Sequence, residues 1–418
     1  MTTHGPLGLF QGFGIEIEYM IVRRDTLEVL PIADRVLAAV AGARDGEVEV
    51  GPLSWSKELV RHVIELKTTE PVAALDAVHR VFQDHVGRID ALLAPYGGRL
   101  LPGGMHPTMD PAVETTLWPG DDDAVYAAFD RIFGCRGHGW SNLQAVHLNL
   151  PFADDGEFGR LHAAIRIVLP LLPALAAASP FMDGRTTGTL DNRLVVYGTN
   201  AARVPRVTGE IVPEPVFTRA GYIAEILEPL YTDMAPLDPD GVLRHEWLNA
   251  RGAIARFDRQ TIEIRLLDTQ EAPVADLAVV AAAVAVVRAL AGERLGAGRD
   301  QRRCPTGALA ALLTSVVRDA DLAVIDDLDY LELLGLPRRA TTAGEVWRGL
   351  LEKCALDEGL SPDVGEALQV ILDEGPLARR LVRLAGPSPR REDLLALSHR
   401  LADCLAAGTM LRTSRSDS

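Results

Sequence analysis

The 418-residue sequence predicts an α+β protein, in which an antiparallel sheet with helices is followed by a helical C-terminal region. Up to about residue 270, short alternating runs mix with helical stretches and show no regular βαβ rhythm. From about residue 273 to 407, apolar residues recur at the three-to-four spacing of helices. We therefore expect an α+β domain over residues 1–290 and a helical region over 291–418 packed on it, with a Gly/Arg-rich connector at 296–307.

The helices are placed by their apolar stripes. Residues 71–93 carry one stripe and residues 158–175 another, although Pro170 and Pro173 must kink or end the second helix. Further helices are expected at 275–290, 308–317, 343–354, 363–384 and 391–406. The uncharged run at 277–287 is shorter than the roughly 20 residues that a membrane-spanning helix needs.

Composition excludes several classes of protein. The chain carries 42 Lys+Arg against 58 Asp+Glu, and a net charge of −16 argues against nucleic acid or an anionic membrane as a partner. None of the three lysines, Lys57, Lys67 and Lys353, follows a glycine, so the G-K-[ST] phosphate loop is absent. Four scattered cysteines and the lack of an export signal lead us to expect a cytoplasmic protein.

Four predicted strands each place two polar side chains on one face, because side chains in a strand alternate with period two. A solvated face of an antiparallel sheet produces the same alternation. Glutamate has a poor strand propensity, however, and four strands far apart in the sequence share the pattern. The pairs are Glu16 with Glu18, Glu65 with Lys67, His147 with Asn149, and Glu263 with Arg265.

If the four strands share one sheet face, their glutamates converge and repel one another. A divalent cation relieves this repulsion, and hard oxygen ligands with at most one imidazole favour Mg²⁺ or Mn²⁺ over Zn²⁺. Arg265, Arg193 and Lys67 would supply positive charge for an anionic substrate. Carboxylates, a metal and arginines in one cradle suit phosphoryl transfer.

Five blocks of sequence, in order between residues 12 and 290, resemble the glutamate–cysteine ligase type 2, or carboxylate–amine ligase, family of the glutamine-synthetase-like superfamily. Each block is short, and their common order carries the resemblance. The blocks are 14–19 (Gly-Ile-Glu-Ile-Glu-Tyr), 104–107 (Gly-Met-His-Pro), 144–150 (Gln-Ala-Val-His-Leu-Asn-Leu), 179–184 with 187–193 (Ser-Pro-Phe-Met-Asp-Gly, Thr-Gly-Thr-Leu-Asp-Asn-Arg) and 261–265 (Thr-Ile-Glu-Ile-Arg).

The resemblance implies an antiparallel sheet curved into a funnel with helices around it. It also implies an ATP-dependent ligase that uses Mg²⁺ or Mn²⁺. A carboxylate, typically that of glutamate, is phosphorylated, and an amine, typically that of cysteine, attacks the acyl phosphate. The implied metal ligands are Glu16, Glu18, Glu65, His147 and Glu263, the implied catalytic residues are Arg265, Arg193 and Glu65, and the implied substrate or ATP contacts are Arg193, Arg265, Asn149, Lys67, His106 and Glu58.

Some features leave alternatives open. Some relatives read His-x-His-x-Gly where this chain has Ala145, His147 and Asn149, so the acceptor amine is undetermined. The segments 135–140 and 244–252 fall outside the family pattern, and each is a candidate wall of the second-substrate pocket. Cys135 with His138 is a nucleophile–base pair, a pair that shares a metal with His147 or, more simply, a buried or loop thiol near a histidine.

Other functions also fit the sequence. The same fold could serve a ligase for a different amino-acid pair, a non-catalytic amino-acid or nucleotide binder, or a metal-dependent hydrolase. Small molecules are the expected partners, and the helical C-terminal region offers a surface for a homodimer.

Overall fold

The computed structural model describes residues 6–41, 46–119, 124–354 and 360–413. Its centre is an eight-stranded sheet of order β2-β3-β4-β1-β6-β10-β9, in which β5 pairs with the second half of β1, and every pairing is antiparallel. The expected α+β architecture with an antiparallel sheet is therefore confirmed. The strands are β1 (Gly14–Arg23), β2 (Glu47–Val50), β3 (Leu53–Lys57), β4 (Val63–Thr68), β5 (Gly98–Leu101), β6 (Ala145–Pro151), β9 (Ala253–Arg256) and β10 (Thr261–Asp268).

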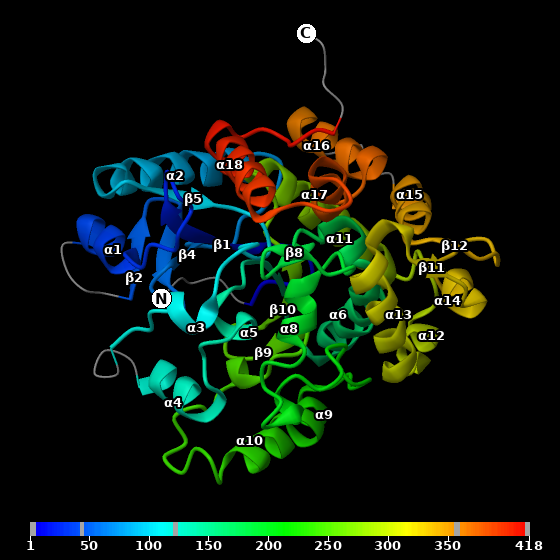
Figure 1. The fold of residues 1–418 in the computed structure, drawn as a ribbon. Coiled ribbons are helices and arrows are strands. Elements are labelled where there is room, and N and C mark those ends of the chain that lie inside the picture. The colour runs from blue at the N-terminus through cyan, green and yellow to red at the C-terminus, as the bar shows by residue number, and fades with distance from the viewer. Residues whose placement is uncertain (1–5, 42–45, 120–123, 355–359, 414–418) are drawn as a thin grey trace.

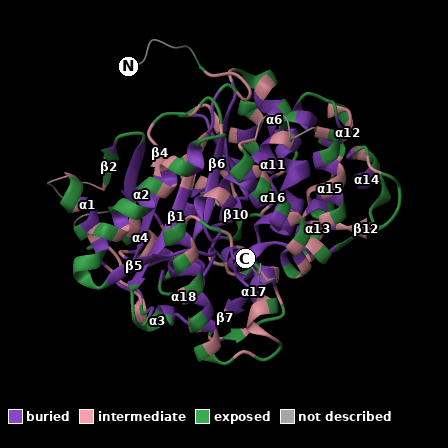
Figure 2. Cartoon of the chain, turned by 90° about the horizontal axis from the view of Figure 1, so that it is seen from above, coloured by how far each residue is buried: buried purple, intermediate pink, exposed green. Residues whose placement is uncertain are grey.

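One face of the sheet is apolar and forms the core. Ile15 and Ile17 of β1 are fully buried there, in one cluster with residues of α2 (Val78–Leu93), α6 (Asp155–Val168) and α11 (Pro273–Ala291). Figure 2 shows buried residues gathered along the central strands and α11, with exposed residues on the outer helices. The alternation of β1 therefore leaves its glutamates on the opposite face.

The chain between the core elements forms short helices and two-stranded pairs. In Figure 1, α4, α9 and α10 lie on the side of the molecule away from the C-terminal helices. The bounds are α1 (Ala33–Ala41), α3 (Pro111–Glu114), α4 (Ala124–Phe133), α5 (His138–Ser141), α7 (Pro173–Ala176), α8 (Asn192–Tyr197), α9 (Arg219–Tyr222), α10 (Glu228–Met234), β7 (Phe181–Met182), β8 (Arg185–Thr186), β11 (Val324–Ile325) and β12 (Thr341–Thr342).

The C-terminal region is helical, as predicted, but two boundaries differ. The predicted helix at 363–384 is two helices, because Gly375 adopts a positive φ of 87° and Pro376 follows it. The predicted connector at 296–307 contains a helix of its own, α12. The helices are α12 (Gly298–Arg303), α13 (Thr306–Asp319), α14 (Leu328–Leu333), α15 (Ala343–Cys354), α16 (Pro362–Glu374), α17 (Leu377–Ala385) and α18 (Arg391–Ala407).

Two helices of the first half also have bounds that differ from those predicted by their apolar periodicity. The helix predicted from residue 71 begins at Val78. The stretch 158–175 is helical only to Val168, and a 3₁₀ turn and α7 follow, because Pro170 and Pro173 remove backbone donors. The core cluster runs through both halves of the chain, from Phe13 to Leu405. The division at residue 290 stays a prediction.

Within the described residues, α11 alone is long and apolar enough to cross a membrane. In the structure 83% of its most apolar window is buried, and α2, α6, α15 and α16 pack against it. Such burial is expected for the core helix of a soluble protein.

Candidate active site

The register of the sheet aligns the polar residues of four neighbouring strands. In antiparallel pairs, residues directly opposite each other point to the same face. The polar pairs of β4, β1, β6 and β10 therefore form continuous rows across the sheet. One row contains Lys67, Glu16 and His147, the next Glu65 and Glu18, and a third Asn149 and Glu263.

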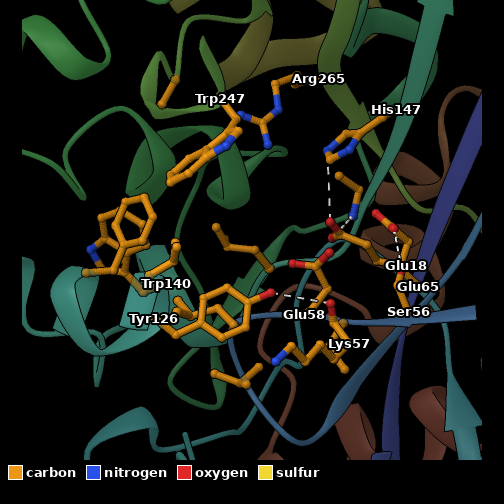
Figure 3. Close-up of a pocket in the computed structure, with 18 of the residues that line it drawn as sticks. Glu18, Ser56, Lys57, Glu58, Glu65, Tyr126, Trp140, His147, Trp247 and Arg265 are labelled. Atoms are coloured by element: carbon orange, nitrogen blue, oxygen red, sulfur yellow. Dashed lines mark hydrogen bonds and ion pairs between the residues drawn. The ribbon is translucent and has the colours of Figure 1, made fainter. Parts of the chain in front are cut away.

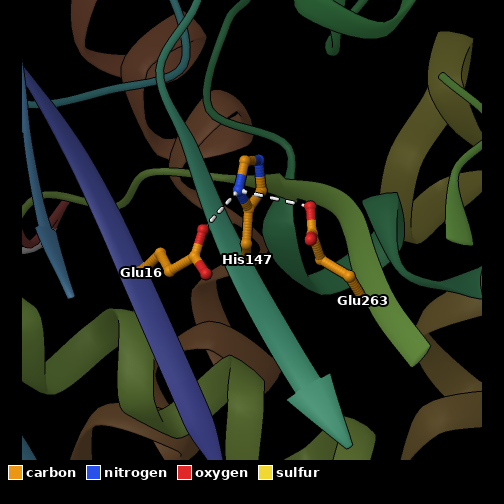
Figure 4. A group of neighbouring side chains, drawn as sticks. All are labelled: Glu16, His147 and Glu263. Atoms are coloured by element: carbon orange, nitrogen blue, oxygen red, sulfur yellow. Dashed lines mark hydrogen bonds and ion pairs between the residues drawn. The ribbon is translucent and has the colours of Figure 1, made fainter. Parts of the chain in front are cut away.

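His147 lies at the centre of these rows (Figure 4). Its Nδ1 is 3.2 Å from Glu16 Oε2 and 3.9 Å from Glu263 Oε1, and its Nε2 is 3.9 Å from Glu18 Oε1. Asn149 donates its amide to Glu16 Oε1 at 3.0 Å. One imidazole is therefore shared by three carboxylates.

A second group of acids lies beside the first. Glu18 accepts a hydrogen bond from the backbone N–H of Ala145 at 2.8 Å, and Glu65 accepts one from the Ser56 hydroxyl at 2.6 Å. Lys67 Nζ lies 3.5 Å from Glu65 Oε1. The hydrogen bonds from Ala145 and Ser56 orient the carboxylates of Glu18 and Glu65. Of these partners only Lys67 carries a charge, and it lies beside Glu65.

Burial and neighbouring charge move the protonation of these acids in opposite directions. Burial raises the pKa of Glu16, but the hydrogen bond and charge of His147, with Lys67 and Arg259, lower it to about 2. Burial, followed by the charge of Glu16, raises the pKa of Glu65 to about 7. One carboxylate is therefore fully ionised at neutral pH, whereas its neighbour is close to its titration midpoint.

Two groups of ligand atoms are close enough to hold a metal ion. They are Glu16, His147 and Glu263, and Glu18, Glu65 and His147, with the ligand atoms of each group within 4.8 Å of one another. Carboxylate oxygens with one imidazole suit Mg²⁺ or Mn²⁺. A neutral imidazole has one free nitrogen lone pair, so His147 can ligate in only one of the two groups at a time.

Arginines lie next to the acids. Arg265 Nε is 3.0 Å from Glu263 Oε1, and Arg256 Nη1 is 3.4 Å from Glu263 Oε2. A β-bulge in β10 leaves Arg265 and Leu266 together opposite His147. The bulge therefore places Arg265 beside the imidazole.

Arg193 is held rigidly behind Arg265. Asp191 caps α8 by accepting from Leu194 N at 2.9 Å, which puts Arg193 in the first helical turn. The Arg193 guanidinium, 2% exposed, donates Nε to Asp268 and its terminal nitrogens to the carbonyl of Arg265, at 3.3 and 3.4 Å. Arg193 thus braces the strand that carries Arg265.

A cavity of about 690 Å³ opens over this part of the sheet (Figure 3). One wall contains Glu18, Glu65, His147, Arg193 and Arg265. The facing wall is aromatic and comes from α4, α5 and the 3₁₀ turn at Glu246–Leu248. Its rings belong to Tyr126, Phe129, Trp140 and Trp247.

A second cavity of about 370 Å³ lies at the other end of the rows, beside the start of β1. It is lined by Gly14, Glu16 and Asn149, and by apolar residues that include Leu7 and Pro71. Both cavities are bordered by Glu47, Lys67 and Arg259. The acids thus lie between two compartments, as a reaction between two bound molecules requires.

The structure brings most of the predicted site residues together, but it places His106 elsewhere. The His106 ring is buried outside both cavities, with Nε2 2.9 Å from the carbonyl oxygen of Leu27. His106 therefore supports a turn in this structure, and a nucleotide contact by His106 stays a prediction. Glu58, directly after β3, does line the larger cavity.

The structure also shows where the segments 135–140 and 244–252 lie, and where Cys135 and His138 lie. Trp140 and Trp247, from the segments 135–140 and 244–252, line the larger cavity. Cys135 is fully buried, and burial raises the pKa of its thiol to about 12, so it stays protonated. His138 Nε2 instead lies 3.0 Å from Asp183 Oδ1.

Sequence reasoning missed several members of the site. Ser56 and Arg256 stand opposite or beside the predicted glutamates, and only the strand pairing reveals this. Asp268 ends β10 out of phase with Glu263 and Arg265, so alternation gave no signal for it and the register shift in β10 was not foreseen. Tyr126 and Phe129 of the aromatic wall lie on α4, outside the matching blocks and outside the two segments singled out as candidate walls, so no motif pointed to them.

Two solved structures share this fold. A glutamate–cysteine ligase of Francisella tularensis, in complex with AMP, has a TM-score of 0.60 at 12% identity and covers 97% of this chain and 90% of its own. A bifunctional glutathione synthetase of Pasteurella multocida has a TM-score of 0.58 at 15% identity and covers 96% of this chain and 52% of its own. The fold class is thus that of the glutamate–cysteine ligases.

The sequence model of Glutamate-cysteine ligase family 2 matches residues 12–398, and this chain belongs to that family. It is therefore an ATP-dependent ligase by family. The match extends well beyond residue 290, so the helical region is part of the family's length.

Two sequence relatives show how far the similarity extends along the chain. An uncharacterized protein of Archaeoglobus fulgidus is 30% identical over 94% of this chain and 98% of its own length. A protein of Rubrobacter xylanophilus, provisionally named glutamate–cysteine ligase 2-3, is 30% identical over 44% of this chain and 48% of its own length.

Proposed function

We propose that this chain forms a γ-glutamyl-type amide by joining the side-chain carboxylate of glutamate to an amine, with ATP as the phosphoryl donor. The observation that carries the proposal is the position of the acids between two cavities, with Arg265 lining the larger one. The AMP bound to the ligase of the same fold supports the use of ATP. The sheet itself would form the curved funnel of the superfamily.

The two cavities are assigned by their chemistry. We place ATP in the smaller cavity, where apolar side chains border the amide of Asn149, and where Lys67 and Arg259 lie toward the acids. The larger cavity then receives the carboxylate and amine substrates. Both substrates meet the phosphoryl group at the carboxylates of Glu16 and Glu18 around His147.

The residues of the chain act at defined atoms. Mg²⁺ or Mn²⁺ would be held by the carboxylates of the two groups, with His147 completing one of them, and would neutralise phosphate oxygens. A donor carboxylate oxygen takes the γ-phosphoryl group, ADP leaves, and Arg265 stabilises the charge that develops. The amine nitrogen then forms the C–N bond as the acyl C–O bond breaks and phosphate leaves. Glu58, whose pKa is raised by burial and then by Glu65, Glu18 and Glu16, accepts the amine proton.

A substrate screen tests the proposal. The protein is incubated with Mg²⁺-ATP, glutamate and a panel of amines, and ADP and product are measured by coupled assay and mass spectrometry. Amide formation with matching ADP release is expected. Binding of ATP without ADP release for any pair would favour the non-catalytic binder, and product formed without ATP would favour the hydrolase. We also propose that the protein is cytoplasmic and forms a homodimer. Its mass in solution under reducing conditions tests the dimer.

The charge of Glu16 is expected to be essential. Glu16→Gln keeps the size of the side chain but removes the charge that faces His147 and the metal group. We expect ADP release to fall by at least about 100-fold, the scale for losing one preorganised electrostatic partner. Glu49→Gln is the control, because Glu49 is exposed on β2 and outside both cavities. Near-normal turnover by Glu16→Gln contradicts the role.

Metal affinity is expected to rise with pH between 6 and 8. The pKa of Glu65 is raised to about 7, so its carboxyl is mostly protonated at pH 6 and a bound cation must displace that proton. The apparent affinity for Mn²⁺, followed by the electron paramagnetic resonance of the free ion, should increase by about tenfold from pH 6 to pH 8. Glu65→Gln should bind more weakly and with a reduced pH dependence; the remainder comes from His147, because burial lowers its pKa but the hydrogen bond with Glu16 raises it above the usual value. An unchanged pH profile in the variant excludes Glu65 as the titrating ligand.

A further inference from the structure

The larger cavity has two walls of opposite character (Figure 3). Across from the acids stand four aromatic rings, from Tyr126, Phe129, Trp140 and Trp247, and all four are only half-buried. The ring of Phe129 links the two tryptophans, with centroids 5.3 Å from Trp140 and 6.0 Å from Trp247. Tyr126, on the same helix as Phe129, lines the same cavity and completes the aromatic wall.

The aromatic wall is preformed. Trp140 Nε1 donates to the carbonyl of Asn200 at 3.0 Å, and Phe133 stacks on the Trp140 ring at 5.3 Å. The preceding residue is glycine for a reason: a Cβ on Gly139 would lie 2.6 Å from the carbonyl oxygen of Val196. This close approach sets α5 against α8 and aims Trp140 into the cavity. The wall therefore does not depend on a ligand to form.

Size and polarity limit what can fill the space before this wall. A cavity of about 690 Å³ is in the range that encloses a drug-sized ligand. A three-carbon amine such as cysteine would reach the acids and leave the rings facing water, and that exposure forfeits the gain from covering aromatic surface. Because the carboxylate donor occupies the part of this cavity beside Arg265, the amine is the substrate that must cover the rings, and this needs a large apolar part.

We propose that the acceptor amine of this ligase carries an aromatic or bulky apolar group, which packs against the aromatic wall while its nitrogen lies toward the acids. The inference rests on the proposed function. The amine is the substrate concerned, because ATP is assigned to the cavity beside Gly14 and the anionic donor needs the opposite wall with Arg265. The Tyr126 ring makes a cation–π contact within the protein, because Lys57 Nζ lies 5.4 Å from its centroid.

Matched pairs of amines test the inference. With Mg²⁺-ATP and glutamate, phenylalanine is compared with alanine and phenethylamine with ethylamine, and cysteine is included. The larger member of each pair should have a kcat/KM at least about tenfold higher, as expected for filling an apolar pocket. Higher kcat/KM for cysteine or alanine overturns the inference and leaves the ligase intact.

If no amine supports ADP release, the proposed function fails, and binding decides the inference separately. The rings include two tryptophans, so phenethylamine and ethylamine can be titrated against tryptophan fluorescence. Binding of phenethylamine at least about tenfold tighter supports the aromatic wall as an amine subsite. Equal binding of the two amines overturns it.

Variants separate recognition from folding. Trp247→Ala should lower kcat/KM for phenethylamine by at least about tenfold and change that for ethylamine by less than about twofold, and Trp247→Phe should restore most of the loss. Val242→Ala is the control, because Val242 packs on the same apolar cluster but does not line the cavity. An equal loss for both amines in Trp247→Ala indicates a structural role and contradicts the inference.

Discussion

Replacing Arg265 by alanine is expected to lower kcat by at least about 100-fold, with the protein still folded. Arg265 lines the larger cavity, its Nε lies 3.0 Å from Glu263, and its backbone carbonyl is held by the Arg193 guanidinium. Such a charge is oriented before the reaction begins, so it stabilises a transferring phosphoryl group at no cost of reorganisation. ADP release with the best substrate pair is the measurement.

Two further variants sharpen this result. Arg265→Lys keeps the charge but loses the planar fork, so it should recover only part of the activity. Arg244→Ala removes an exposed arginine outside the cavity, 3.6 Å from Glu228, and should leave kcat unchanged. A kcat for Arg265→Ala within about threefold of the unaltered protein would exclude Arg265 from the reaction.

Replacing Arg380 by methionine is expected to lower the free energy of unfolding by about 3–5 kcal/mol, the range for breaking a buried ion pair. Arg380 on α17 and Glu271, three residues after β10, are both fully buried and bonded to each other. Arg380 also donates to the carbonyl of Leu411 at 2.6 Å, and Leu411 N donates to Glu271. The pair ties the C-terminal region to the strand that carries Arg265.

Urea unfolding followed by circular dichroism measures this effect. Arg383→Met is the matched control, because Arg383 lies on the same helix but is exposed. The double variant Arg380→Met with Glu271→Gln should recover part of the loss, since no unpaired charge then remains buried. If Arg380→Met lowers the free energy of unfolding by less than about 1 kcal/mol, then the other partners of Glu271 are sufficient to stabilise its buried carboxylate without Arg380.

The polar strands could be predicted because their signal is local. Period-two alternation places Glu16 and Glu18 on one face of β1 whatever the rest of the chain does. The helix α15 matches its predicted bounds, 343–354, because its apolar stripe is regular. The helix predicted at 363–384 was wrong at its centre, where Gly375 and Pro376 outweigh the apolar spacing.

The composition of the site could be predicted only in part. A motif placed His106 among the substrate contacts, but its ring lies outside both cavities, with a nitrogen facing the Leu27 carbonyl. The segments 135–140 and 244–252 were expected as candidate pocket walls, and Trp140 and Trp247 come from them, whereas Tyr126 and Phe129 on a third element had no signal. Long-range packing brought the four rings together, and such packing leaves no periodicity in a single chain.

The sequence by itself determined the polar faces of the strands, the family and the absence of a lysine-based phosphate loop, since each depends on residue types at short spacing. Only the tertiary structure decided which strands are neighbours and in which register. The pairing of Glu16 with His147 and the bulge that turns Arg265 toward them come from hydrogen bonds between strands more than 100 residues apart. A one-residue slip in either pairing would move those side chains to the apolar face, which is why the buried core of the sheet fixes the site.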